Sequence, residues 1–263
     1  SFGNHQALEI ALEVALMLNA TVVDEIQFMR KTVVDGSNVS GFQRTALIGI
    51  NGHIDTEQGK VTIPSICLEE EAAKKIETAK DFTKFRLDRL GIPLIEIATD
   101  ASIKDPHHAK EVAGIIGMIL RSTSKVKRGL GTIRQDVNVS IKGGARTEIK
   151  GFQDLRSIPK VIEYEVQRQI KDIEAGKTIN QQVRKAESDF TTTFLRPMPG
   201  AARMYPETDQ PPIPITKERI ATIKIPELLT KKIENYEHHF KIPHGVAKEL
   251  VNFPKFEEYL KKY

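Results

Sequence analysis

The sequence contains no tryptophan and only one cysteine, and each shortage narrows the class of protein it can encode. A single cysteine, Cys67, allows neither an internal disulfide nor a cysteine-based zinc site, so a reducing cytoplasm fits. No apolar run approaches the ~20 residues that a membrane-crossing helix needs, and no signal peptide is recognisable. We therefore expect a cytoplasmic protein that has no membrane partner.

The motifs of several common enzyme classes are missing as well. The sequence has no glycine-rich phosphate loop of the P-loop or dinucleotide-binding type. Its seven histidines show no metal-ligand spacing, and no serine has recognisable histidine and aspartate partners. Nucleophilic hydrolysis therefore has no support from the sequence.

What is present is typical of a folded protein with a locally basic surface. Hydrophobic residues make up 40% and charged residues 28% of the 263, which is enough for a sizeable core. The chain starts at Ser1 without a methionine, and we expect a truncated or processed chain. The net charge of +4 becomes informative in residues 120–134, where the cations cluster. That stretch is either a solvated surface or a contact for phosphate or nucleic acid.

Periodicity of the apolar residues predicts a mixed fold. Helices are expected over residues 5–19, 70–79, 106–120, 157–175, 217–223, 225–240, 243–251 and 256–263. Strands are expected over residues 21–29, 31–38, 41–50, 59–69, 91–100, 132–141 and 145–152. We expect a polar linker over 177–189 and an irregular segment over 195–215. Helices and strands do not alternate strictly, which favours an α+β fold with a mostly antiparallel sheet and flanking helices.

Acidic residues recur on the predicted strands. Glu69 or Glu70 ends one strand, Glu96 interrupts the apolar run of a second, and Asp136 and Glu148 lie on two more. If these strands are neighbours in one sheet, the acids form a carboxylate patch mixed with cations. Carboxylates, water and substrate phosphates are the ligands that Mg²⁺ prefers, and cations beside them could stabilise a transferring phosphoryl group.

Each acid also has a simpler structural interpretation. Glu69 and Glu70 could begin a helix, where acidic residues complement the helix dipole. Glu96 could form an ion pair with a nearby arginine, because a buried carboxylate needs a partner. Asp136 and Glu148 could lie on a solvated sheet face with cross-strand charge pairs. These alternatives stay open from the residues alone.

Six blocks, which together span residues 29–209 almost continuously, point to a family. They include "MRKTVVDGSNVSGFQRTALI", "ICLEEEAAKKI", "DRLGIPLIEIATDASIKDPHHAKEVA", "LRSTSKVKRGLGTIRQDVNVSI", "GARTEIKGFQDL" and "FLRPMPGAARMYPETD". These blocks closely resemble the E-type chain of the archaeal Glu-tRNA(Gln) amidotransferase. More distantly, they resemble the bacterial and organellar B-type chain of the same B/E family.

The resemblance implies a catalytic cradle domain over residues 1–216, related in fold to glutamine synthetase and guanidino kinases, and the start of a helical domain over 217–263. It implies that ATP and Mg²⁺ serve to phosphorylate the γ-carboxylate of Glu-tRNA(Gln). Ammonia from an asparaginase-like partner, the D-type chain of the amidotransferase, would then give Gln-tRNA(Gln), in a heterotetramer that contains a homodimer. Two alternatives are an incomplete fragment that binds tRNA or its partner, and a stand-alone ligase that acts on free glutamate.

The matching motifs also carry over candidate site residues. The catalytic and metal-binding candidates are Glu69, Glu70, Glu96 and Glu148. The candidates for phosphate contacts or their support are Arg134, Asp136 and Arg146, together with the cavity-lining loop residues Ser40, Gly41, Gln43 and Arg44. The basic stretch supplies the tRNA-binding candidates Arg121, Lys125, Lys127 and Arg128.

The sequence departs from the family pattern in three places. The opening strand of the family, which supplies a glutamate and a histidine near the metal, has no counterpart before Ser1. A domain usually inserted after the long helix is replaced by the short polar stretch near 176–189. The tail that grips tRNA has no counterpart after the last predicted helices. We therefore expect an incomplete metal shell and a truncated chain.

Overall fold

A computed structural model describes residues 3–129, 131–152, 154–253, 259 and 262. It has an α+β fold whose strand pairs are antiparallel, except for β10 and β11. In chain order the elements are α1 (His5–Met17), β1 (Thr21–Val22), β2 (Glu25–Ile26), β3 (Phe28–Thr32), β4 (Phe42–Thr56), β5 (Gly59–Glu70), β6 (Lys74–Thr78), β7 (Thr83–Arg86), β8 (Pro93–Ala98), α2 (Pro106–Ser122), β9 (Val137–Val139), β10 (Thr147–Lys150), α3 (Ser157–Glu174), β11 (Gln182–Ala186), β12 (Thr192–Pro197), β13 (Met204–Pro206), β14 (Ile213–Pro214), α4 (Lys217–Thr222), α5 (Leu229–Phe240) and α6 (His244–Leu250).

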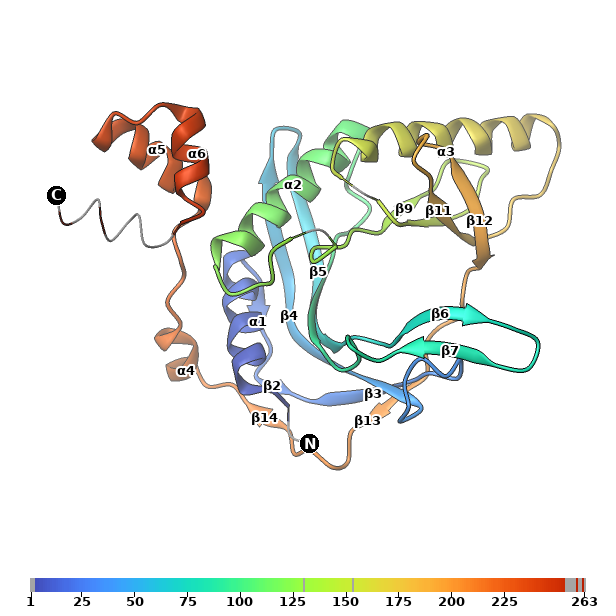
Figure 1. Cartoon of the computed structure of the whole chain (residues 1–263), viewed down its shortest axis with the longest axis horizontal. Helices are drawn as coiled ribbons and strands as arrows, with labels where there is room; N and C mark the ends of the chain where they lie inside the picture. Colours follow the sequence, from blue (N-terminus) through green and yellow to red (C-terminus); the bar gives the residue numbers. More distant parts are fainter. Residues whose placement is uncertain (1–2, 130, 153, 254–258, 260–261, 263) are drawn as a thin grey trace.

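The first sheet has the order β13-β3-β4-β5-β8, and β1 also pairs with β4. Helix α1 packs against β4 and β5 because its apolar side chains recur at helical spacing. Leu8 and Leu12 of this helix and its C-cap residue Leu18 are buried with Ile63 and Ile66 of β5 in the larger core. The core therefore lies on the face of the sheet that α1 covers, and the opposite face is left for polar groups (Figure 1).

The second sheet has the order β12-β11-β10-β9 and packs with α3 around a smaller core. Ile149 of β10 and Ile158 and Val161 of α3 are buried there. Strands β10 and β11 are parallel, so α3 serves as the crossover between them. Figure 1 shows this sheet and α3 above β6 and β7, across from the polar face of the first sheet.

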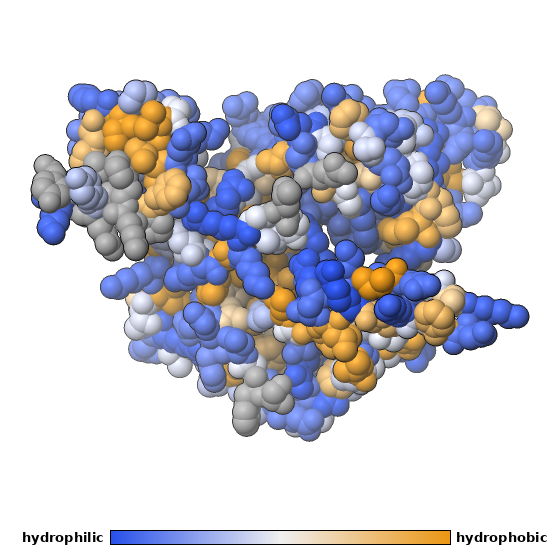
Figure 2. All heavy atoms as spheres, viewed as in Figure 1, coloured by the Kyte–Doolittle hydropathy of each residue, from blue (hydrophilic) through white to orange (hydrophobic). Residues whose placement is uncertain are grey.

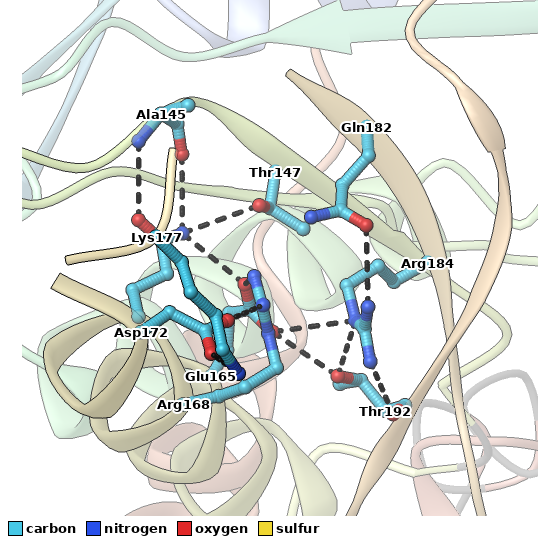
Figure 3. A network of polar contacts seen from close by, with 10 residues as sticks. Ala145, Thr147, Glu165, Arg168, Asp172, Lys177, Gln182, Arg184 and Thr192 are labelled. Carbon is cyan, nitrogen blue, oxygen red and sulfur yellow. Dashed lines mark hydrogen bonds and ion pairs between the residues drawn. The ribbon is translucent and has the colours of Figure 1, made fainter. Parts of the chain in front are cut away.

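A polar network attaches α3 to the second sheet (Figure 3). The fully buried carboxylate of Glu165 accepts hydrogen bonds from Arg168, with an Nη2–Oε1 distance of 2.7 Å, and from the Thr192 hydroxyl at 3.1 Å. Arg184 on β11 lies 3.5 Å from the same carboxylate. Burial opposes ionisation of Glu165, but the hydrogen bonds from Arg168 and its other partners lower its pKa below the ordinary value.

Several predicted elements are confirmed, including α1, β5, α2 and α3. Asp105 caps α2 by accepting a hydrogen bond from the His108 N–H at 2.9 Å, and Pro106 opens the helix, as the sequence predicts. Pro64 lies just before β5 begins to pair with β8 at Ser65, so the strand has only one neighbour at that residue.

The predicted helix over residues 70–79 is wrong. Residues Lys74–Thr78 form β6, which pairs with β7 in a hairpin. Every residue of β6 is exposed, so a helix here would have no apolar face to bury, whereas pairing satisfies the backbone. The backbone of Glu71 instead exchanges hydrogen bonds with Gly91 and Ile92 at 2.8 Å. The helix-start interpretation of Glu69 and Glu70 is therefore excluded.

Other boundaries also differ from the prediction. The two strands expected over 21–29 and 31–38 are replaced by the short β1 and β2 and by β3, which crosses the expected break. Only Val137–Val139 of the strand expected over 132–141 is extended and paired. The expected linker over 177–189 contains β11, and the irregular segment over 195–215 contains parts of three strands. These short strands pair with distant strands, which local patterns do not reveal.

The C-terminal part contains α4, α5 and α6, where helices were predicted. Leu229 at the start of α5 donates its backbone N–H to the Ser122 hydroxyl of α2 at 3.0 Å. Apart from residues 259 and 262, the helix predicted over 256–263 lies outside the described residues. The division of the chain at residue 216 stays a prediction. In the described residues, every helix is too short or too polar to cross a membrane.

Candidate functional site

Two carboxylates lie together on the polar face of the first sheet. Cys67 of β5 pairs with Glu96 of β8, and Glu69 lies two residues further along β5, so the three side chains share one face. The Glu96 side chain is exposed, but the surrounding concave face removes part of its hydration. This desolvation, the nearby charge of Glu69 and a hydrogen bond with it raise the pKa of Glu96.

Strand β8 is an edge strand, and its residues are half-buried or exposed although the run is apolar apart from Glu96. Within the described residues, no arginine, lysine or histidine forms an ion pair with Glu96. The structural ion pair considered as its alternative role is therefore not seen. Glu96 has another carboxylate as its neighbour, which is an arrangement that needs a proton or a cation to relieve charge repulsion.

Neighbouring strands hold Glu69 in place. Lys31 of β3 lies 3.0 Å from its Oε1 atom, and the Thr45 hydroxyl of β4 donates to the same oxygen at 2.7 Å. The same polar face raises the pKa of the Cys67 thiol to about 11, through burial first and then through the charges of Glu96 and Glu69. Cys67 is therefore protonated at neutral pH and is not a nucleophile.

Glu70 belongs to a different cluster, because adjacent strand residues point to opposite faces. Its carboxylate lies 3.3 Å from Arg44 of β4, and Arg44 also donates to Glu207 at 2.8 Å. Glu207 is buried and forms a second ion pair with Arg30, which also reaches Asp209 at 2.9 Å. The hydrogen bond from Arg30 outweighs burial and, with Arg44, lowers the pKa of Glu207 to about 2.

The predicted loop of Ser40, Gly41, Gln43 and Arg44 joins this cluster at one end. The Gln43 amide donates to the backbone oxygen of Glu70, and the Arg44 guanidinium lies 5.8 Å from the centre of the Phe42 ring. Ser40 donates to the Phe42 backbone oxygen at 2.9 Å, and Gly41 has a positive φ of 75° that favours glycine. Gln43 and Arg44 thus lie on β4 rather than in a loop, so this part of the prediction is wrong, and contact of the segment with a nucleotide stays a prediction.

Asp136 and Glu148 belong to the second sheet region, so the prediction of one continuous carboxylate-bearing sheet is wrong. Both acids form ion pairs with Lys150 of β10. Burial alone would lower the pKa of Lys150, but its hydrogen bonds to Asp136 and Glu148 raise it. The negative charge of Asp136 also raises the pKa of Glu96, so the two regions interact electrostatically. Arg146 is exposed beside them.

Glu71, the third acid of the "EEE" run, holds two arginines. Arg89 lies 2.9 Å from its Oε2 atom and Arg134 lies 2.9 Å from its Oε1 atom. The Glu71 side chain is buried, whereas about half of the Arg134 side chain is exposed. Glu71 therefore holds the guanidinium group of Arg134, and the exposed half of the Arg134 side chain is accessible to a ligand.

The residues present fit a single Mg²⁺ ion at the carboxylate pair. Glu69 and Glu96 share one face, and a divalent cation could take the place of the proton between them. In the described part of the chain, no three His, Cys, Asp or Glu residues gather closely enough to form a complete metal cage. Mg²⁺ commonly uses one or two carboxylates, with waters and substrate phosphates as the other ligands. The pair, but not the full set of four predicted glutamates, meets that need.

The sequence analysis missed Lys31, Arg30 and Glu207. Arg30 and Arg44 are opposite each other on paired strands, which places two like charges side by side and calls for an acid between them. The signal for Glu207 was its place in the "YPETD" motif, although nothing local indicates that this acid is buried. Strand β13, which precedes it, pairs with β3 from the other end of the chain.

The fold and the site together define an α+β domain with paired carboxylates set among arginines and lysines. A model of the GatB/GatE catalytic domain matches residues 2–221. The chain belongs to the GatB/GatE catalytic domain family.

Relatives in this family include the E-type chains of archaeal glutamyl-tRNA(Gln) amidotransferases. That of Archaeoglobus fulgidus is 35% identical over 390 residues, covering 98% of this chain and 63% of the relative. That of Methanocaldococcus jannaschii is 36% identical over 400 residues, covering 99% and 64%. That of Thermococcus sibiricus is 58% identical over 184 residues, covering 70% and 29%.

The chain spans 63 to 64% of the length of the first two relatives. Their alignments are also longer than the 263 residues of this chain, so these relatives contain residues inside the aligned region that have no counterpart here. The placement of that missing segment near residues 176–189 stays a prediction.

Proposed function

We propose that this chain is the catalytic part of a tRNA-dependent amidotransferase that converts Glu-tRNA(Gln) to Gln-tRNA(Gln). In the proposed reaction, the γ-carboxylate of the tRNA-bound glutamate attacks the γ-phosphorus of ATP and ADP leaves. Ammonia then attacks the acyl phosphate, and inorganic phosphate leaves as the amide forms. The supporting observation is the Glu69–Glu96 pair on one face of the first sheet, with Lys31 beside Glu69.

Each group of this chain has a role in that reaction. Glu69 and Glu96 would hold Mg²⁺, which when bound supplies charge neutralisation for the phosphates. Lys31 and Thr45 fix the Glu69 carboxylate, with contacts of 3.0 Å and 2.7 Å. Arg134 is held by Glu71, so its guanidinium group needs little reorganisation to meet a developing negative charge, whereas Arg44 lies with Glu70 on the opposite face of the sheet.

The ammonia would come from an asparaginase-like partner, the D-type chain, in a heterotetramer that contains a homodimer. Exposed apolar side chains support docking of a protein partner, because large apolar residues on a surface often mark contact sites. Phe194 and Leu195 of β12 and Met204 and Tyr205 of β13 are between 44% and 58% exposed. Figure 2 shows apolar residues gathered in patches among hydrophilic ones on this face of the molecule.

The decisive variant is Glu96→Gln, compared with Glu77→Gln at an exposed position of β6. We expect Glu96→Gln to lower ATP-dependent formation of Gln-tRNA(Gln) by about a thousandfold, because a metal ion supplies several kcal/mol of charge stabilisation. Its tRNA affinity should stay within about twofold of the unchanged chain, because no phosphate contact is lost. Glu77→Gln should change neither quantity. An equal loss of turnover and tRNA affinity would show that Glu96 maintains the fold rather than the reaction.

Mn²⁺ binding, followed by electron paramagnetic resonance with and without ATP, separates this function from a second candidate. That candidate is a module that binds tRNA or its partner without activity of its own. Exposed apolar side chains such as Phe194 and Leu195, which a docking partner would cover, fit it equally well. Binding that ATP strengthens and Glu96→Gln removes supports the enzyme, whereas tRNA binding without any Mn²⁺ binding supports the module.

A further inference from the structure

The basic loop over residues 123–136 is anchored at both ends by buried acids. Near its start, Lys125 forms an ion pair with Glu13 of α1, whose side chain is only 3% exposed. Near its end, Arg134 lies 2.9 Å from Glu71, whose side chain is 8% exposed. Two of the five cations of the basic stretch therefore attach the loop to α1 and to the end of β5.

The three other cations of the stretch surround a hollow of about 350 Å³, which we call the loop hollow. These are Arg121 from the end of α2, and Lys127 and Arg128 from the loop. In the part of the chain that the structure describes, none of the three has a carboxylate within ion-pair distance. Arg128 donates a hydrogen bond of 3.1 Å to the backbone oxygen of Asn252.

One acid, Asp154, also lines the loop hollow, but its carboxylate is already engaged. It accepts hydrogen bonds from the backbone N–H groups of Arg156 and Ser157 at 2.8 Å and 2.9 Å. Hydrogen bonds from Ser157 and Arg156 outweigh burial and lower the pKa of Asp154, so it stays ionised. Three cations against one acid leave the hollow net positive.

The walls of the loop hollow suit more than a bare anion. Ile133, Phe152 and Leu155 add apolar side chains to its lining. Gly117 of α2 leaves room for the neighbouring guanidinium, because a Cβ atom there would lie 3.3 Å from the Nη1 atom of Arg121. A hollow lined by cations together with aromatic and aliphatic side chains can receive a phosphate together with a base.

The loop hollow is separate from the carboxylate pair. Ile133 and Gln135 line the hollow, whereas Arg134 contacts Glu71 and Asp136 contacts Lys150 on the other side. The segment from Ile133 to Asp136 thus forms a wall between the two. A ligand in the hollow would contact cations that the carboxylate site does not use.

We propose that the loop hollow binds one phosphorylated nucleotide, with its phosphate at Arg121, Lys127 and Arg128 and its base against Phe152. The nucleotide could belong to the tRNA strand or to free ATP, and both sources present the same chemistry. This proposal deepens the proposed function and rests on it, because it divides the predicted tRNA-binding residues into anchors and contacts. Lys125 is an anchor, and the other three are contacts.

The test compares Lys127→Gln with Lys110→Gln, which removes an exposed cation from the first half of α2. Both full-length variants are titrated with tRNA over a series of salt concentrations, and separately with ATP. A lost phosphate contact should flatten the slope of log affinity against log salt by about 0.7 to 0.9 for Lys127→Gln alone. If ATP is the ligand, Lys127→Gln should instead weaken ATP binding and leave the tRNA slope unchanged.

A change in the tRNA salt slope or in ATP affinity for Lys127→Gln alone supports nucleotide binding in the loop hollow and identifies the source of the nucleotide. Equal behaviour of Lys127→Gln and Lys110→Gln in both titrations would overturn the proposal. That failure is distinguishable from failure of the proposed function, because amidation by the unchanged chain with its partner is measured independently. An Arg121→Gln variant repeats the comparison from the helix side, so the outcome does not depend on the folding of one loop variant.

Discussion

Glu165 on α3 and Glu96 on β8 are two acids with opposite surroundings. Glu165 is fully buried, with arginines, a glutamine and a threonine directed at its oxygens (Figure 3), and its pKa is lowered. Glu96 is exposed on a concave face beside another acid, and its pKa is raised. The first arrangement is complete without a ligand. The second leaves charge repulsion that an added cation would relieve, so the partners of an acid indicate its role better than its burial does.

The largest effect should come from Glu165→Ala. Removing this carboxylate leaves Arg168 and Arg184 close together in a largely buried place, with no common counter-charge. We expect the free energy of unfolding to fall by about 3 to 5 kcal/mol, as measured by urea denaturation. Glu163→Ala, at an exposed position of the same helix, should change it by less than about 0.5 kcal/mol. Similar losses in the two variants would contradict the structural role assigned to the network.

An intermediate effect should come from acidification, through Glu207. Its pKa is about 2 in the folded chain against an ordinary value of 4.5. A lowered pKa stabilises the folded state above the ordinary value, and this contribution is lost as the pH falls from about 5 towards 2. Allowing for solvent screening, we expect it to reach about 2 kcal/mol.

The measurement is urea denaturation of the unchanged chain and of Glu207→Gln over this pH range. Glu207→Gln should be less stable at pH 7, and the difference should shrink as the pH falls. A difference that is independent of pH would show that Arg30 and Arg44 do not recognise the charge of Glu207.

The smallest effect should come from Glu96→Gln on stability without metal. A raised pKa favours the protonated folded state, so the contribution of Glu96 is present below its ordinary value of 4.5 and is lost as the pH rises through the raised value. A glutamine side chain does not titrate, so the Glu96→Gln variant does not lose stability in this way. We therefore expect Glu96→Gln to be as stable as the unchanged chain at pH 7, or more stable by less than about 1 kcal/mol. Clear destabilisation at pH 7 would place Glu96 in the same class as Glu165.

The sequence predicted those parts of the fold that depend on local periodicity. Helices α1, α2 and α3 have long apolar stripes and clear ends, and β5 has a continuous apolar pattern. The helix expected over residues 70–79 failed because its charged residues suit a helix and an exposed hairpin equally well. Strands β11, β13 and β14 were missed because they are short and are defined by partners that are distant in sequence.

The site was predictable in part, for a related reason. Glu96 was singled out because an acid in an apolar strand is unusual and Glu69 because it ends a second strand, and strand pairing does bring them onto one face. Glu70 and Glu148 do not join this pair, because Glu70 points to the opposite face and Glu148 belongs to another sheet. Ion pairs such as Glu71 with Arg134 depend on how loops lie over the sheet, which no spacing rule indicates.

The closing of the first sheet by β13 has a consequence for biosynthesis. Strand β3 is completed only by residues Met204–Pro206, and β2 only by Ile213–Pro214. During translation, the outer edge of β3 therefore stays unpaired until about 170 further residues have been added. Contacts of such high sequence separation form slowly and leave open strand edges in the meantime. The nascent chain should depend on chaperones over this interval, and the sheet that carries the carboxylate pair becomes complete only late in synthesis.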